Sequence, residues 1–403
     1  MQEKEHRPPK SDMSTSFTDI LTMISVTCMA IFVGFYLCYF LICALSLRTK
    51  KTAYRLDPQP RPRSDMRSVT MLVPVYNEAR VVSRKLDNIQ AIDYSDGKLD
   101  AIFVDGGSTD GTPDLVETES RRHDFPVKVI RQGARKGFNS AIIEGFPEAK
   151  GEVICIPGAE TEYDPQALNF MARHFDDPKV GAVVGRQRIS NLREGISPQL
   201  EANYRDIYNF LIEAESLIDS PFDIKGEICA TRRNILAGLV TNPEFLRRGT
   251  IDTCVSFQGR IDGYRTVYEP QAVYYELSPR SVRDSFKQGI RRGATLIQNM
   301  MIFKSMILNR RYGAFGMLVM PAHYCLLVIL PFLFLAGVVG MIGMAVGGSM
   351  WALVLIGCGL LGTLFSRRLQ ALVKTQLVLL AANLRLLTGI ETQKFERLES
   401  ARP

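Results

Sequence analysis

Apolar residues are concentrated in two long runs that contain no Asp, Glu, Lys or Arg. The first run is the 28 residues 20–47, and the second is the 55 residues 312–366. A helix needs about 20 apolar residues to cross the hydrocarbon core of a bilayer, so the first run predicts one crossing and the second predicts two. Gly347, Gly348 and Ser349 supply a turn within the second run. The first run is too long for a signal peptide and predicts a permanent anchor.

Between the two runs, short β-rich segments alternate with helical ones. Strands are predicted at 69–75, 101–104, 127–130 and 153–156, and helices at 81–92, 113–121, 139–148 and 165–173. This βαβ alternation predicts an α/β domain with a mostly parallel, Rossmann-like sheet and right-handed crossovers. Ligands of such sheets bind beyond the carboxyl ends of the strands, where Asp105 and residues 158–160 are expected.

After Ser366, apolar residues recur at helical spacing and predict an amphipathic helix that lies in the membrane interface. Its apolar positions are Leu369, Leu372, Val373, Leu377, Leu380, Leu384 and Leu387. Lys374 and Arg385 share the opposite face. A third crossing in the C-terminal region, with these charges turned inward, stays open as the alternative.

The net charge of +7 comes largely from basic residues beside the apolar runs, and these do not form one stripe with interleaved aromatics. This distribution argues against a nucleic-acid partner. The flanking cations are Arg48, Lys50, Lys51, Arg55, Lys304, Arg310, Arg311, Arg367 and Arg368. By the positive-inside rule they predict that residues 48–311 are cytoplasmic, although Lys4, Arg7 and Lys10 argue weakly the other way for the N-terminus.

Three regions follow from these patterns. Residues 1–66 are expected to hold a polar tail, a transmembrane anchor and a Pro-rich linker at 57–64. Residues 67–300 form the α/β domain, and residues 301–403 form a membrane domain with two transmembrane helices and the C-terminal amphipathic or third membrane helix. The eight cysteines include no C-x-x-C pair, so neither a disulfide framework nor a zinc site is indicated.

Two segments near predicted strand ends are candidates for nucleotide contact. The first reads Val-Pro-Val-Tyr-Asn-Glu and ends at Glu78; the second reads Val-Asp-Gly-Gly-Ser-Thr-Asp-Gly-Thr and contains Asp105. A carboxylate at a strand end, followed by glycines and small hydroxyls, suits close contact with a base or ribose. The same residues also suit an Asp that caps a helix and a tight turn.

Together these segments resemble the family 2 glycosyltransferases, whose nucleotide-sugar-binding domain has the GT-A fold. The resemblance covers about residues 69–293, and the flanking apolar runs suit the membrane-bound branch of that family. It implies that Asp105 contacts the base of a UDP- or GDP-linked donor, with Glu78 in the same donor-binding region. This chain has Gly106 where the family usually has a second Asp.

Lys136 lies in the segment Arg-Lys-Gly-Phe-Asn, where the family usually has a Gly-Lys segment that opens a helix near the nucleotide. Its ammonium could neutralise diphosphate charge, and the helix N-terminus would add its dipole. A solvated basic turn is the alternative.

Glu160 is the candidate metal ligand. The family normally has Asp-x-Asp at this position, and its last Asp binds the divalent metal; here the segment reads Gly158-Ala159-Glu160. Mg²⁺ or Mn²⁺ accepts one carboxylate together with phosphate oxygens and water, so Glu160 alone could serve. Glu162 and Asp164 follow closely but equally suit the start of the next helix.

Asp252 is the candidate base. It lies in Thr-Ile-Asp, where the family has a Glu-Asp pair whose Asp is the catalytic base of inverting members. Inverting transfer needs a carboxylate that takes the proton of the acceptor hydroxyl. Ile251 replaces the usual Glu, and a helix-capping Asp is the alternative.

Gln288, Arg291 and Arg292 form a segment that resembles the Q-x-x-R-W motif of membrane-bound synthases, with Arg292 in place of Trp. Arginine forks match phosphate oxygens, so this segment could hold the donor diphosphate or a lipid phosphate. The missing Trp argues against long-chain processive synthesis. Interfacial arginines bound to anionic lipid are the alternative.

Two functions remain in view. The first is an inverting, metal-dependent glycosyltransferase that transfers sugar to a polyprenyl phosphate, a lipid-linked glycan or a polysaccharide. The second is a nucleotide-sugar-binding pseudoenzyme that acts as a scaffold or regulator in a membrane complex, motivated by the altered positions Gly106, Gly158 and Ile251. Since no Walker A, G-x-G-x-x-G or G-x-S-x-G sequence is present, ATPase, dehydrogenase and α/β-hydrolase functions lack support.

Overall fold

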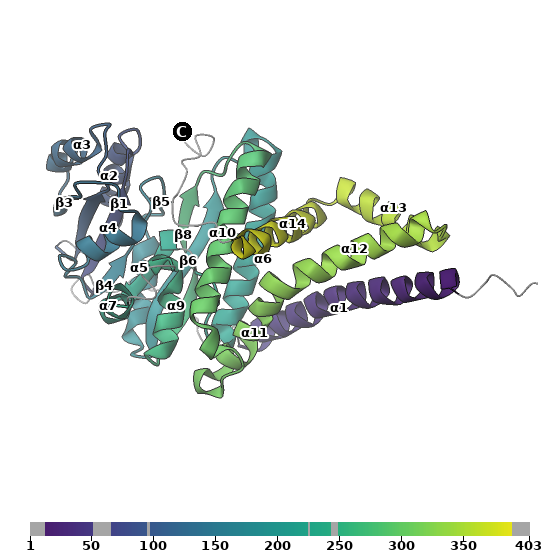
Figure 1. The fold of residues 1–403 in the computed structure, drawn as a ribbon. Helices are drawn as coiled ribbons and strands as arrows, with labels where there is room; N and C mark the ends of the chain where they lie inside the picture. The colour runs from purple at the N-terminus through teal and green to yellow at the C-terminus, as the bar shows by residue number, and fades with distance from the viewer. Residues whose placement is uncertain (1–12, 51–65, 95–96, 225, 243–248, 389–403) are drawn as a thin grey trace, which may run out of the picture.

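The computed structural model describes residues 13–50, 66–94, 97–224, 226–242 and 249–388 (Figure 1). The predicted Pro-rich linker at 57–64 lies outside these residues. Within them, an α/β domain lies at one end, and long helices from both ends of the chain extend away from it (Figure 1).

The α/β domain contains one eight-stranded sheet in the order β3-β2-β1-β4-β7-β6-β8-β5. The strands are β1 (Val69–Val75), β2 (Leu99–Asp105), β3 (Val127–Arg131), β4 (Val153–Cys155), β5 (Glu162–Tyr163), β6 (Val180–Ile189), β7 (Cys229–Arg232) and β8 (Arg265–Glu276). β1 pairs in parallel with β2 and β4, and β2 pairs in parallel with β3, which confirms the predicted first half. β7 and β5 pair antiparallel with their neighbours. β7 has four residues and β5 has two, so both strands are too short to show a recognisable alternation of apolar and polar residues in the sequence.

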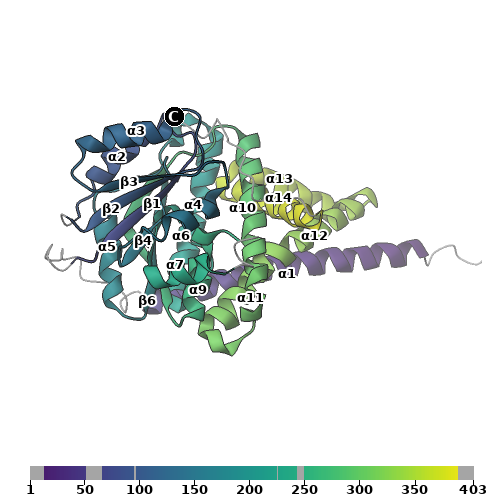
Figure 2. The ribbon, with the colours of Figure 1, turned by 60° about the vertical axis from the view of Figure 1, so that its left-hand side comes forward.

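Helices cover both faces of this sheet because alternate strand residues point to opposite sides (Figure 2). Met71, Val73 and Phe103 face one core, together with residues of α2 (Val82–Gln90), α3 (Thr112–Glu119) and α5 (Ala167–Arg173). Leu72 and Val104 face the other core. The helices that contribute to this second core are α4 (Phe138–Gly145), α6 (Ile196–Ile218), α7 (Arg233–Val240), α9 (Ile251–Ile261) and α10 (Val282–Ile302).

Two described helical segments are long and apolar enough to cross a membrane: Ile20–Thr49 within α1 (Met13–Lys50), and Phe315–Val346. The second includes α11 (Met320–Tyr324), α12 (Leu330–Val346) and two π-helical turns. α1 and α12 run side by side (Figure 1). Ser25 Oγ of α1 donates a hydrogen bond to the Gly337 carbonyl at 2.8 Å, so small residues let the two backbones approach closely.

The predicted crossing at 350–365 corresponds to α13 (Met350–Phe365), which has only 16 residues. It reaches the length of a membrane span only together with α14 (Arg367–Leu387), and the two helices meet at a bend of 110°. The second apolar run therefore contains one long candidate span and the first helix of a bent pair.

The predicted C-terminal helix is present as α14, but its polar side faces the protein. Lys374 Nζ lies 2.6 Å from Ser285 Oγ of α10, and Gln376 and Asn383 are buried. Part of the leucine stripe points away from the protein, since Leu377 and Leu384 are 45% and 49% exposed, whereas Leu372 is half-buried. α14 is thus held to the α/β domain by polar groups, small residues and the buried Val378 and Leu379, while its exposed leucines remain available to an apolar surrounding.

Candidate functional site

Two loops at the carboxyl ends of β1 and β2 are tied together by Asn77. Its amide N–H donates to Ser108 Oγ at 2.7 Å, and its side-chain oxygen accepts from the Thr109 N–H at 2.7 Å. Asn77 has a φ of 54°, a left-handed conformation that Asn adopts more readily than most residues. The next amide, that of Glu78, donates to Thr112 Oγ1 at 2.8 Å. These bonds place Glu78 beside the Asp105 loop, as expected of one donor-binding region.

Asp105 lies at the end of β2 and is only 3% exposed. Its carboxylate accepts hydrogen bonds from the Gly107 and Ser108 amides, each at 3.1 Å, and from the Ser108 hydroxyl. The observed contacts of this side chain are therefore those of a loop-fixing carboxylate. The predicted contact with a donor base stays a prediction.

The glycines after Asp105 differ in what they permit. Gly107 has a φ of 81°, and a Cβ there would lie 3.2 Å from the Ala134 backbone, so this position favours glycine. At Gly106 the nearest atom to an added Cβ is 3.4 Å away, which is ordinary contact. The space around residue 106 would therefore admit the Cβ of a larger side chain, at the position where the family usually has its second Asp.

The basic segment before α4 lies beside the same loops. The Arg135 guanidinium stacks over the Tyr76 ring at 4.3 Å, and Lys136 Nζ pairs with Glu144 Oε1 at 2.8 Å. The Lys136 side chain is 53% exposed. Its surface position beside the strand ends is compatible with the predicted diphosphate contact, but Glu144 is the partner that the structure records.

Glu160 lies in the turn that follows β4. The turn is fixed by Lys85 of α2, whose Nζ donates hydrogen bonds to the Thr161 carbonyl at 2.9 Å and to Thr161 Oγ1 at 3.3 Å. A Cβ added to Gly158 would lie 3.2 Å from Glu160 Oε2, so the Glu160 carboxylate reaches back to the space beside residue 158. One longer side chain thus occupies the region where two Asp residues are expected.

Two further charged side chains, those of Lys85 and Arg291, interact electrostatically with Glu160. The Lys85 ammonium is 1% exposed, and burial lowers its pKa to about 7, opposed by the charges of Glu160 and Glu162. Burial and then the charge of Arg292 lower the pKa of Arg291 to about 10, and the opposing carboxylates include Glu227 and Glu160. Residues from α2, the β4 turn and α10 therefore form one charged cluster.

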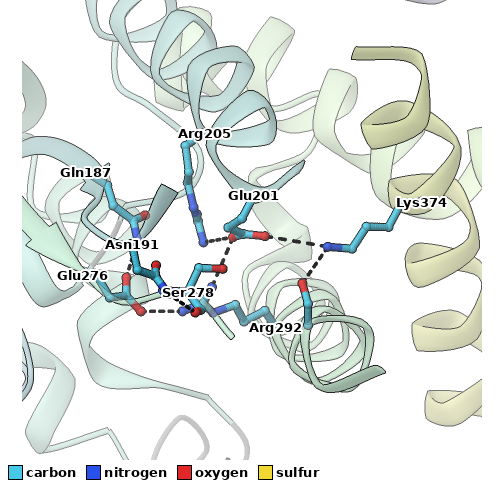
Figure 3. A network of polar contacts seen from close by, with 9 residues as sticks. Gln187, Asn191, Glu201, Arg205, Glu276, Ser278, Arg292 and Lys374 are labelled. Carbon is cyan, nitrogen blue, oxygen red and sulfur yellow. Dashed lines mark hydrogen bonds and ion pairs between the residues drawn. The ribbon is translucent and has the colours of Figure 1, made fainter. Parts of the chain in front are cut away.

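The two arginines of α10 have different surroundings. Arg292 is held by two carboxylates: its Nη2 lies 3.1 Å from Glu276 Oε1, and its Nη1 lies 3.6 Å from Glu201 Oε1 (Figure 3). Gln187 donates a hydrogen bond to the other oxygen of Glu276. Arg292 therefore belongs to an internal network, whereas Arg291 lies within electrostatic reach of Glu160.

Asp252 lies in the first turn of α9, and its side chain is not among those that the structure describes. The start of this helix is fixed by two asparagines: the Ile251 N–H donates to Asn139 Oδ1, and the Thr250 N–H donates to Asn299 Oδ1, both at 3.2 Å. Ile251, which replaces the family's Glu, is fully buried in the core. The neighbour of Asp252 is therefore a packing residue.

Several residues of this site are absent from the sequence-based candidates. They are Lys85, Asn139, Glu201, Glu227, Glu276 and Asn299. Lys85 had a detectable signal because it occupies an inward position of the α2 pattern, with Val82, Leu86 and Ile89. The others become recognisable only when α4, α6, α10, β8 and the turn before β7 are brought together.

A divalent metal would find one suitable carboxylate here. Within the described residues, no group of three or more His, Cys, Asp or Glu side chains is arranged to hold a metal ion. Mg²⁺ commonly binds through one or two carboxylates plus substrate phosphates and water. Glu160 therefore fits a metal bound jointly with a diphosphate, and it does not fit a metal held by protein ligands alone.

Comparison with known proteins adds three likenesses. Residues 70–239 match the family model described as Glycosyl transferase family 2. The chain is 26% identical to the poly-beta-1,6-N-acetyl-D-glucosamine synthase of Staphylococcus aureus (strain COL) over 246 residues, and 26% identical to that of Staphylococcus epidermidis over 225 residues. These alignments cover 60% and 55% of this chain, and 58% and 53% of the relatives. The chain thus spans a little over half the length of the curated relatives that it matches.

A solved structure is similar over nearly the whole chain. It is the mannosyltransferase PcManGT from Pyrobaculum calidifontis, in complex with GDP-Man and Mn²⁺. The TM-score is 0.78 at 26% sequence identity, and the likeness covers 92% of this chain and 100% of that one. Both the sheet and the helices around it therefore have a counterpart in that structure.

Proposed function

We propose that this chain, whose residues 70–239 match the Glycosyl transferase family 2 model and whose fold is of the GT-A type, transfers a sugar, with inversion, from a nucleotide-sugar to a membrane-associated acceptor. The observation that carries the proposal is the position of Glu160 in the turn after β4, with Arg291 of α10 within electrostatic reach of it. A carboxylate for a metal and a guanidinium for phosphate, placed together, suit the departure of a nucleoside diphosphate.

Each site residue then has a defined task. Arg291 binds the diphosphate, and Lys136 neutralises its outer charge. Glu160 holds Mg²⁺ or Mn²⁺, which supplies Lewis-acid stabilisation of the diphosphate when it is bound. The loops of Glu78 and Asp105 position the nucleoside, and Asp252 takes the proton from the acceptor hydroxyl. The structure of the similar mannosyltransferase, which contains GDP-Man and Mn²⁺, supports a nucleotide-sugar donor, which we propose to be GDP- or UDP-linked.

The acceptor is proposed to lie at the membrane because the site is flanked by the candidate spans. Arg48 lies at the end of the first span, and Arg310 and Arg311 precede the second. By the positive-inside rule these flanks support a cytoplasmic α/β domain in a multi-pass protein. A membrane lipid phosphate, a lipid-linked glycan or a polysaccharide would then reach the site from the bilayer side.

The test is sugar transfer by the purified full-length chain, given labelled GDP- and UDP-sugars with membrane lipid extract. We expect a labelled lipid or glycan product that requires Mg²⁺ or Mn²⁺. Glu160→Gln should abolish most of the transfer. Glu162→Gln is the matched control, since Glu162 is a half-exposed neighbour that pairs with Arg84 at 2.7 Å. Donor binding without transfer by the parent protein would instead favour the pseudoenzyme.

A further inference from the structure

A cavity of about 190 Å³ lies where the α/β domain meets the membrane helices. It is enclosed by α1, α6, α10, the second candidate span and α14. One apolar or aromatic residue from each shows the arrangement: Tyr36, Leu211, Leu296, Leu327 and Leu379. Most of the lining is apolar, and two of the five walls belong to helices that are apolar enough to cross a bilayer. The hydrophobic molecules available at this position are therefore membrane lipids.

Part of the lining is strongly charged. Glu201, Arg205, Arg292 and Lys374 line the cavity and lie together in the network of Figure 3. Arg205 is only 2% exposed and donates to Glu201 at 2.6 Å through Nη2. Its Nε and Nη1 have no hydrogen-bond partner within the described part of the chain. With Asp223, the charged lining residues comprise three cations and two carboxylates, and Glu276, which pairs with Arg292 at 3.1 Å, balances the remaining charge.

We propose that this cavity binds the lipid of the acceptor, with its hydrocarbon chain between α1, α6, α10 and α14 and its phosphate beside Arg205 and Arg292. This inference rests on the proposed function and names its acceptor as a lipid phosphate. Arginine forks match phosphate oxygens, and the Nε and Nη1 donors of Arg205, which have no partner among the described residues, are available to such a group. A cavity of roughly 150 Å³ is known to accept benzene, so this one has room for a short segment of a single chain.

The position of α10 connects this cavity to the donor site. Gln288 and Arg292, one turn apart, line the cavity. Arg291, which directly precedes Arg292, lies within electrostatic reach of Glu160 and Glu227. α10 therefore carries both an arginine of the cavity and the arginine proposed for the donor site. A lipid phosphate held near Arg292 would lie close to the departing diphosphate, as transfer requires.

Photolabelling of the full-length protein tests the proposal. The probe is a polyprenyl phosphate with a diazirine in its chain, applied to the protein in lipid nanodiscs. We expect labelling of peptides from α6, α10 or α14, with competition by unmodified polyprenyl phosphate. Leu372→Trp, which adds bulk to the lining, should reduce labelling by about tenfold, the order expected for an over-packed site. Leu377→Trp on the outer face of α14 is the control and should label as the parent does.

Several outcomes would overturn the assignment: no labelling of these helices, labelling without competition, or equal labelling of both tryptophan variants. Equal, competed labelling by a diazirine phosphatidylglycerol would identify an ordinary membrane lipid instead. Sugar transfer measured in parallel separates this proposal from the function. Specific labelling without any transfer supports the lipid site and refutes the glycosyltransferase activity. Transfer without specific labelling refutes the lipid site and supports the glycosyltransferase activity.

Discussion

Lys85 makes the stability of the protein dependent on pH in a predictable direction. Its ammonium is 1% exposed, and burial lowers its pKa from 10.5 to about 7. Between these values the unfolded chain binds the proton and the folded chain does not, so stability rises with pH across this window. Below pH 7 both states are charged, and the full cost of burying the charge is present.

The expected size follows from those two values. From pH 7 to pH 9 the contribution of Lys85 should become more favourable by about 2 kcal/mol. In a domain of this size, 1 kcal/mol shifts the melting temperature by roughly 2–4 °C, so the shift should be about 4–8 °C. Other groups also titrate in this range, and a comparison with Lys85→Met removes their share because only the difference between the two proteins is used.

The assay is thermal unfolding of parent and Lys85→Met in detergent at pH 7, 8 and 9. The melting temperature of the parent, relative to that of Lys85→Met, should rise steadily as the pH rises. Lys128→Met is the control, because Lys128 is 54% exposed and pairs with Glu148 at the surface. A parent-to-variant difference that stays constant from pH 7 to pH 9 would refute the reasoning. It would mean that the bonds to Thr161 keep the ammonium charged in the folded protein.

Three further predictions concern the site and the membrane. Asp252→Asn should lower the transfer rate by about 10²–10⁴-fold with little change in donor affinity, since it removes a general base. Asp105→Ala should instead weaken donor binding first. Transfer at the parental rate by Asp252→Asn would exclude Asp252 as the base. Mn²⁺ should bind weakly until a nucleoside diphosphate is added, as followed by calorimetry, and tight nucleotide-free binding that survives Glu160→Ala would place the metal elsewhere. A cysteine at Ser349 should react with an impermeant reagent from outside intact cells; reaction only after lysis would contradict the topology.

The sequence by itself determined the features that depend on local geometry. β1 runs from Val69 to Val75 as predicted, and β2, β3 and β4 lie within two residues of their predicted bounds. Their parallel pairing also followed, because alternating strands and helices leave few ways to form a sheet. The Asp105 and Glu160 turns were placed correctly at strand ends for the same reason. The spacing of apolar residues within a short segment indicates whether that segment forms a strand or a helix, so these elements can be predicted from neighbouring residues alone.

Only the tertiary structure decided which distant groups meet. Arg292 could be assigned to phosphate from its position in the chain, but the fold places it between Glu201 and Glu276, 91 and 16 residues away. α14 was recognised as an amphipathic helix, yet packing turned Lys374 toward α10 and left Leu377 and Leu384 exposed. A buried charge must find its partners wherever the chain brings them, so its role is set by the packing of whole helices. No local pattern records that packing.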